Sequence, residues 1–255
     1  MKIFVLGCSF SKYYWPTWVD ILQKSNSDIE FLNFARPGIG NSRIFYRLTE
    51  LLYKNFITDQ DKIFIVWTSW HREDRLINNK WTEEGNIFNS KLYGEKFAKK
   101  YWSSDFDIIK NCNSIISANK ITKISLNGSW LKLENTESYY GDKIFSGTNY
   151  SNLYDKYNFL TKNLPEFIRF DHSTNTFFNY KSDDKHPDVM CHYDYAKKVA
   201  KYAGLKIDNC EVWKFYQNKI EQNIKLELKR EKLWNIISEI TDFKPNFIDP
   251  IRLES

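Results

Sequence analysis

Ser9 is the residue of this sequence best placed to act as a nucleophile. It lies in the run Gly7-Cys8-Ser9-Phe10-Ser11, directly after a short apolar segment that predicts a β-strand. A serine at the carboxyl end of a strand, beside a glycine and entering a turn, projects its hydroxyl into the crevice above the sheet. Its own N–H can face the same point. Gly-x-Ser is common after strands, so this run alone does not define a catalytic site.

A second run, Asp183-Asp184-Lys185-His186-Pro187-Asp188, supplies a base. An aspartate three residues before a histidine in a loop can bring its carboxylate to Nδ1 of the imidazole. That contact fixes the tautomer and leaves Nε2 to take a proton from a serine. The alternative is a metal cluster, although no standard zinc spacing is present. Its candidate ligands would be Asp183, Asp184, Asp188, Cys191, His192 and Asp194. We interpret His192 instead as a helix-start residue that packs or orients the loop.

A turn with two glycines, Arg36-Pro37-Gly38-Ile39-Gly40, follows the second predicted strand. Glycine permits a backbone conformation that offers an unobstructed N–H to a ligand, whereas a plain Pro-Gly turn is the structural alternative. A dinucleotide fingerprint is not favoured, because Arg43 stands where its third glycine would be.

Alternating strands and helices must position these residues. This alternation predicts an α/β fold with a doubly wound parallel sheet between helices, in which ligands bind at the carboxyl ends of the strands. The predicted strands are 3–6, 30–34, 62–67 and 122–126, and the predicted helices are 17–24, 43–56 with Asn41 or Ser42 as cap, 105–118, and 192–203 closed by Gly204.

The order of these features resembles the SGNH (GDSL-like) hydrolase superfamily. The Gly-Cys-Ser-Phe-Ser run matches a variant of the first block of that family, Asn33-x-Ala35-x-x-Gly38 matches the second, and Asp183-x-x-His186 matches the last. The resemblance covers about residues 1–204. It implies a three-layer, flavodoxin-like SGNH fold and a catalytic triad of Ser9, His186 and Asp183. It also implies an oxyanion hole that includes the N–H groups of Ser9 and Gly38, with no cofactor and no metal.

The third block of the family departs from its usual pattern in this sequence. It normally ends in Gly-x-Asn-Asp, whose asparagine side chain donates to the oxyanion, but this chain reads Trp67-Thr68-Ser69-Trp70-His71. Ser69 or Thr68 is a candidate replacement, and Asn41 from the neighbouring loop is another. Loss of one such donor costs about 3 kcal/mol of transition-state stabilisation.

The resemblance implies a serine ester hydrolase. We expect small acyl groups, such as acetyl esters of carbohydrate, because no lipid-binding lid is evident and Trp and Tyr are frequent in the expected insertions at 75–103 and 127–182. Two alternatives remain open. One is an acyltransferase with the same triad. The other is an inactive glycan-binding protein of the same fold, which the missing asparagine favours and the presence of Ser9, Asp183 and His186 disfavours.

Composition narrows the class of protein further. The net charge is +5 and the charges are interspersed, which argues against a nucleic-acid partner. No apolar run approaches about 18 residues, so no membrane span is expected. The apolar start is too short for an export signal, and the four cysteines form no disulfide or metal framework. We therefore expect a protein that is cytoplasmic or otherwise not exported by a cleaved signal. The high content of Lys, Asn and Ile favours an AT-rich genome, bacterial or viral.

Residues 205–255 are expected to form a helical extension. Apolar residues recur at helical spacing through 211–241, which predicts one long helix or two. This helix either packs back on the domain or serves for docking, in which case it would join two copies into a homo-oligomer.

Overall fold

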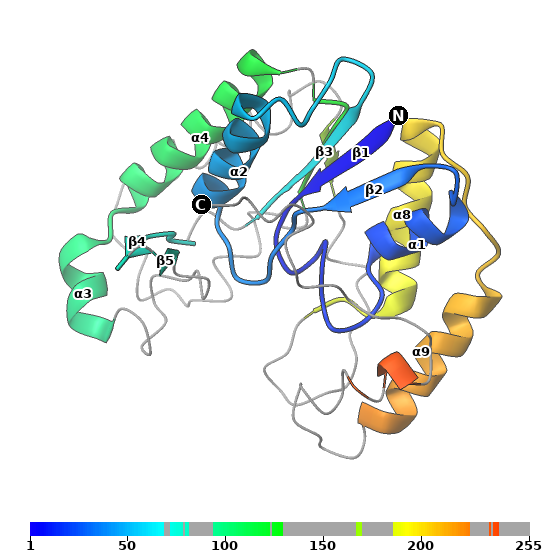
Figure 1. The fold of residues 1–255 in the computed structure, drawn as a ribbon. Coiled ribbons are helices and arrows are strands. Elements are labelled where there is room, and N and C mark those ends of the chain that lie inside the picture. Colours follow the sequence, from blue (N-terminus) through cyan, green and yellow to red (C-terminus); the bar gives the residue numbers. More distant parts are fainter. Residues whose placement is uncertain are drawn as a thin grey trace.

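The computed structural model describes residues 1–68, 72–78, 80–81, 94–122, 124–129, 167–169, 186–224, 235 and 237–239. Its centre is a parallel sheet of five strands in the order β2-β1-β3-β6-β7 (Figure 1). The strands are β1 (Lys2–Leu6), β2 (Glu30–Asn33), β3 (Lys62–Trp67), β6 (Leu126–Ser129) and β7 (Phe167–Arg169). Counted along the chain, this is the 2-1-3-4-5 order of flavodoxin-like sheets, so the predicted α/β class is confirmed.

Helices cover both faces of the sheet and complete three layers (Figure 1). On one face lie α1 (Trp18–Ser25) and α8 (Val189–Ala203), and on the other lie α2 (Asn41–Tyr53) and α4 (Ser104–Ile121). Successive side chains of β1 point to opposite faces of the sheet: Ile3 and Val5 join the α1/α8 core, whereas Phe4 and Leu6 join the α2/α4 core. Burial on both faces explains why β1 and β3 read as uninterrupted apolar runs.

The C-terminal half of the sheet differs from the prediction. The fourth strand, β6, begins at Leu126 instead of residue 122, because α4 continues to Ile121 and Thr122 is its C-cap. Strand β7 was not predicted at all, since it lies within the stretch assigned to loops and short elements. A hairpin of β4 (Leu76–Ile77) and β5 (Lys80–Trp81) and helix α3 (Gly94–Tyr101) lie within the expected 75–103 insertion.

The start of α2 also differs from the prediction. Its N-cap is Gly40, and neither Asn41 nor Ser42 caps it, because both belong to the helix. The capping group comes from a distant loop: the carboxylate of Asp74 accepts hydrogen bonds from the N–H of Gly40 (2.8 Å) and the N–H of Arg43 (3.0 Å). A side chain from another element therefore takes the role that local capping rules assign to a neighbour. The helix ends at Tyr53, short of the predicted residue 56.

Helix α8 begins at Val189, earlier than predicted, with Asp188 as its N-cap. The Asp188 carboxylate accepts a hydrogen bond from the Cys191 N–H at 2.8 Å. The predicted end is confirmed: Gly204 is the C-cap at φ +67°, a conformation that glycine adopts without a side-chain clash. The loop that carries His186 therefore leads straight into a firmly capped helix.

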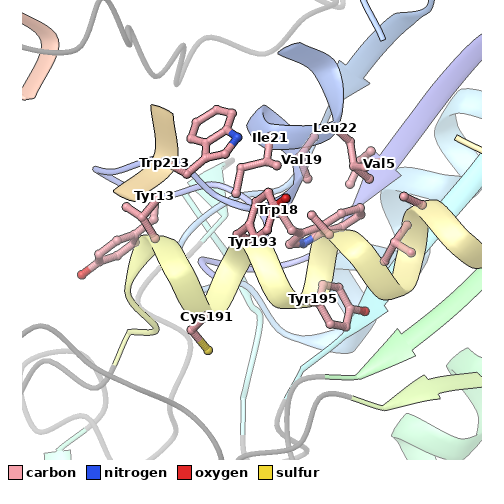
Figure 2. Packing of buried hydrophobic residues seen from close by; sticks show 14 of the residues in the cluster. Val5, Tyr13, Trp18, Val19, Ile21, Leu22, Cys191, Tyr193, Tyr195 and Trp213 are labelled. Atoms are coloured by element: carbon pink, nitrogen blue, oxygen red, sulfur yellow. The ribbon is translucent and has the colours of Figure 1, made fainter. Parts of the chain in front are cut away.

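The extension packs back on the domain through α9 (Glu211–Ile224), which lies against α8. Trp213, Tyr216 and Ile220 are buried in the same core as α1 and α8, and Figure 2 shows Trp213 over the side chains of α1. Gln217 Oε1 accepts the N–H of Val189 at 2.9 Å, which ties α9 to the start of α8. The apolar face of the described helix is thus used within the chain, while 225–234 and 240–255 lie outside the described residues.

Among the residues that the structure describes, no helix combines the length and the apolar character that a membrane crossing requires.

Candidate active site

Ser9 lies at the carboxyl end of β1, next to β3 in the sheet. This is the point where the strand order of a flavodoxin-like sheet reverses and where such sheets bind ligands. A tight turn follows β1 and is closed by a hydrogen bond from the Ser11 N–H to the Cys8 carbonyl at 3.0 Å. Ser9 is 2% exposed, and its Oγ has no hydrogen-bond partner within the described part of the chain. A buried hydroxyl without a partner is rare, so this group calls for an explanation.

Ser11 anchors the turn. Its Oγ accepts from the Trp18 indole at 3.2 Å, and its carbonyl accepts from Thr17 Oγ1 at 3.1 Å and from Asn33 Nδ2 at 2.8 Å. Gly7 makes this packing feasible, because a Cβ at Gly7 would lie 2.7 Å from Ser11 Oγ. The turn that presents Ser9 is therefore fixed by α1 and by the strand beside it.

The Gly38 turn runs beside the Ser9 turn. Beyond the strands, the parallel ladder of β1 and β2 continues as the Arg36 N–H donates to the Gly7 carbonyl at 3.1 Å. Gly38 has φ +84°, a backbone conformation that side chains other than glycine rarely adopt. The structure thus brings Gly38 to the same edge of the sheet as Ser9, as the second motif requires.

His186 lies among aromatic side chains of the segment that follows Ser9. Its imidazole stacks on Tyr13, with ring centroids 3.8 Å apart and planes at 15°. Phe10 and Trp15 meet it edge-on, at centroid distances of 5.3 and 6.5 Å. The Trp15 indole N–H also donates to the Pro187 carbonyl at 2.8 Å, so the histidine loop is fastened to the serine segment. Ser9 and His186, far apart in sequence, therefore belong to one local assembly.

Asp183, the predicted third member of the triad, lies outside the described residues, as does Ser69. The triad as a set stays a prediction.

His192 lies within the first turn and a half of α8 and is 1% exposed. Burial, reinforced by the neighbouring His186, lowers the pKa of His192 to about 3. His192 is therefore neutral at ordinary pH and fits a packing role, and His186 is the other histidine among the residues that the structure describes.

Asn41 holds the chain where β3 ends. Its Oδ1 accepts the Thr68 N–H at 2.8 Å, and its Nδ2 donates to the Thr68 carbonyl at 3.0 Å and to Asn111 Oδ1 at 2.5 Å. Both amide hydrogens are thus committed, so Asn41 positions this turn and has no hydrogen left for an oxyanion in this arrangement.

Thr68 carries the remaining candidate donor at the end of β3, its side-chain hydroxyl. Its side chain is 3% exposed, and its Oγ1 has no hydrogen-bond partner in the described ranges. The β1–β3 register pairs Leu6 with Ile65, so the turns that follow the two strands leave the sheet at the same edge. Two buried hydroxyls with no hydrogen-bond partner among the described residues therefore follow neighbouring strands at this edge.

The turn after β3 is pressed against the start of α2. A Cβ at Gly40 would lie 2.7 Å from Asp74 Oδ2 and 2.9 Å from the Arg72 carbonyl, so only glycine allows this approach. Burial raises the pKa of the Asp74 carboxyl, and the hydrogen bonds from the N–H groups of Gly40 and Arg43 oppose the rise. Gly40 is thus a packing glycine, distinct in role from Gly38.

Asn41 contacts a buried network of polar side chains on α4 through Asn111. Asn111 Nδ2 donates to the Asp107 carbonyl at 2.6 Å, and Lys110 pairs with Asp107 (3.1 Å) and Glu73 (2.6 Å). Burial raises the pKa of Asp107 to about 6, against the opposing charge of Lys110. The sequence interpretation missed this network. Its signal was the presence of Asp107 and Asn111 four residues apart, a spacing that places both on one face of a helix.

No group of three or more His, Cys, Asp or Glu side chains suited to a metal ion gathers within the described ranges. Of the acidic residues near His186, Asp188 caps α8, and Asp194 is paired with Lys197 at 2.6 Å.

No family model matches the sequence, and a search among curated proteins finds no match. Solved structures do resemble it. A member of the lipolytic protein G-D-S-L family from Veillonella parvula has a TM-score of 0.45 and 14% identity, covering 79% of this chain and 97% of its own. The esterase EstA from a Pseudoalteromonas species has a TM-score of 0.42 and 16% identity, covering 80% and 98%. A lipase from a goat rumen metagenome has a TM-score of 0.41 and 15% identity, covering 82% and 100%. Because the identities are this low, the chemistry proposed below rests on the residues of this chain.

Proposed function

We propose that this protein is a serine ester hydrolase that works through Ser9 and an acyl-enzyme. The observation that carries the proposal is the placement of Ser9. Its hydroxyl is buried and without a hydrogen-bond partner in the described residues, it stands at the switch point of a flavodoxin-like sheet, and the segment that follows it holds His186.

In this mechanism Ser9 Oγ attacks the ester carbonyl while His186 accepts its proton. The protonated imidazole then returns the proton to the leaving alcohol, and water, activated by the same imidazole, hydrolyses the acyl-enzyme. Asp183 holds the imidazole in the required tautomer and supports its positive charge. These steps use side chains alone, and we propose no cofactor and no metal.

The oxyanion that forms on the carbonyl needs donors at the same edge of the sheet. We assign the N–H groups of Ser9 and Gly38 to it, together with Thr68 Oγ1. Gly38 is supported by its positive φ and by the ladder that joins its turn to the Ser9 turn. Thr68 is supported by its buried hydroxyl, whereas the amide of Asn41 is already committed. Ser69 remains the neighbouring candidate.

We propose small acyl groups, with acetyl esters of carbohydrate as the substrate class. The support comes from the sequence, in which Trp and Tyr are frequent in the segments expected to be insertions, 75–103 and 127–182. Aromatic faces are common platforms for sugar rings because they are flat and apolar.

The decisive experiment combines a fluorophosphonate probe with p-nitrophenyl esters of increasing chain length. The wild type should be labelled and should release acetate fastest, and Ser9→Ala and His186→Ala should show neither labelling nor turnover. Ser27→Ala is the matched control, since Ser27 is exposed and lies away from the site. A folded wild type that is neither labelled nor active would contradict the proposal. Activity that appears only with a sugar acceptor would replace hydrolysis by acyl transfer.

A further inference from the structure

We propose that Tyr13 is a positioning residue whose ring face holds the imidazole of His186 and stabilises its protonated form while Ser9 reacts. The inference rests on the proposed function for its role in turnover. The interaction between the two rings, on which the inference depends, can be measured without any substrate.

The Tyr13 ring is a fixed platform. It is 2% exposed, and it meets Trp15 and Tyr14 edge-on at centroid distances of 4.5 and 5.1 Å. Figure 2 shows Tyr13 beside the first turn of α8, which is the helix that His186 precedes. A ring held by two edges cannot follow a neighbour that moves, so it restricts the orientation of whatever stacks on it.

The stacking geometry favours a cation. At a centroid distance of 3.8 Å and an angle of 15°, the imidazole lies nearly flat on the face of Tyr13. The face of an aromatic ring carries the negative part of its quadrupole, so it attracts a positive charge above it. A neutral imidazole gains only dispersion there, whereas an imidazolium also gains this electrostatic attraction. The stack therefore stabilises the proton-bound state that the reaction creates.

Other groups near His186 also bear on its charge. His192, in α8, is neutral because burial lowers its pKa to about 3. The Asp188 carboxylate, two residues along the chain, accepts the Cys191 N–H, and this hydrogen bond does not cancel its attraction for a nearby cation. The Lys12 ammonium donates to the Asn33 carbonyl at 3.2 Å, and Phe10 and Trp15 meet the imidazole edge-on. Asp183, which by sequence would be the counter-charge, lies outside the described residues. Tyr13 is the described aromatic side chain whose face lies flat on the imidazole, so changing this ring alone tests its effect on protonation.

The test is an NMR titration of the His186 imidazole, identified by its absence from His186→Ala spectra. Tyr13→Phe keeps the ring face and should leave the pKa of His186 within about 0.2 units. Tyr13→Leu removes the face and should lower that pKa by about half a unit to one unit, the size of a partly buried cation–π contact. The matched control is Tyr53→Leu, which removes an 86% exposed tyrosine ring at the end of α2 and should leave the titration unchanged.

Fluorinated phenylalanines at position 13 provide a second test that does not depend on correct folding of the leucine variant. They keep the shape of the ring while successive fluorines weaken the quadrupole, so the pKa of His186 should fall stepwise with fluorine number. An unchanged pKa in folded Tyr13→Leu, or across the fluorinated series, would overturn the inference.

Failure of the ester hydrolase proposal would be a different result. In that case Ser9→Ala and wild type would share the same lack of turnover, while the titration would still respond to Tyr13. If the protein is an esterase, the acidic limb of its kcat/KM profile should move with the titrated pKa in each variant.

Discussion

The turns after β1 and β3 meet at one edge of the sheet, but they are held by different kinds of contact. The β1 turn is fixed mainly from nearby in the chain, through Ser11, Thr17 and Trp18, and by the aromatic contacts of His186. The β3 turn is fixed from far away, by the amide of Asn41 and, behind it, by Asn111 on α4. One half of the candidate site rests on local turns and apolar stacking, and the other on long-range polar clamps.

Because of this difference, we expect the two halves to respond differently to substitution. Aromatic stacking depends on shape and tolerates conservative changes, whereas a buried amide clamp loses several hydrogen bonds when a single side chain is removed. Substitutions in the first half should therefore separate activity from stability, and substitutions in the second half should couple them.

The largest effect is expected for Ser9→Ala. Removal of the nucleophile should lower kcat by at least about 10⁴-fold, because the remaining groups cannot replace the covalent step. The same change deletes a buried hydroxyl that has no hydrogen-bond partner among the described residues, so the free energy of unfolding should rise by about 1 kcal/mol. Denaturant unfolding and burst kinetics measure both quantities. A loss of stability together with retained turnover would reverse the interpretation of this turn.

The next effect tests Thr68 as oxyanion donor. Thr68→Val keeps the shape of the side chain and removes Oγ1, so kcat should fall about 10²–10³-fold with little change in KM. Thr68→Ser keeps a hydroxyl and should recover most of the rate. Since Oγ1 has no partner among the described residues, the melting temperature of Thr68→Val should not fall. Full activity in Thr68→Val would transfer the donor role to Ser69.

Asn41→Ala should cost stability as well as rate. It leaves the N–H and the carbonyl of Thr68 and the Oδ1 of Asn111 without their partner, a loss of about 2–4 kcal/mol in the free energy of unfolding. Activity should fall with it, because the clamp sets the position of Thr68. Asn218→Ala on the exposed face of α9 is the control. An Asn41→Ala protein of normal stability would show that the β3 turn is held by other contacts.

The same contrast explains what could be predicted from the sequence. The β1 turn was predicted well, because β1 is an apolar run buried on both faces and its turn residues follow it directly in the chain. Gly38 was found for the same reason, since a glycine after a strand is a local signal. Tyr13, in contrast, is an ordinary aromatic residue until the fold brings His186 against it.

The β3 side could not be predicted by the same rules. The cap of α2 comes from Asp74, 34 residues from Gly40, so local capping rules selected Asn41 or Ser42 instead. Asn41 was considered as an oxyanion donor because the sequence does not show that Thr68 and Asn111 already use its amide hydrogens. Strand β7 is only three residues long, too short for a periodic signal. When the partners of a side chain come from distant parts of the chain, the residues next to it in the sequence carry no signal of those contacts.

The smallest effects concern the pH dependence of stability, and the two halves should respond with opposite sign. In the β1 half, folding lowers the pKa of His192 to about 3, so the unfolded chain binds more protons between pH 3 and its ordinary pKa of 6.5. Stability should therefore fall by about 2 kcal/mol from pH 7 to pH 5 through this group.

In the β3 half, folding raises the pKa of Asp107 from 3.8 to about 6, so the folded chain binds more protons in that window. Acidification from pH 7 to pH 5 should then add about 1 kcal/mol of stability. Urea unfolding at both pH values would separate the two: His192→Leu should remove the loss on acidification, and Asp107→Asn should enlarge it. If both substitutions change the pH dependence of stability in the same direction, the polar network on α4 does not hold Asp107 in the buried state described here. The two halves would then differ in their contacts but not in the sign of their pH dependence. Opposite signs require a buried carboxyl in one half and a buried imidazole in the other.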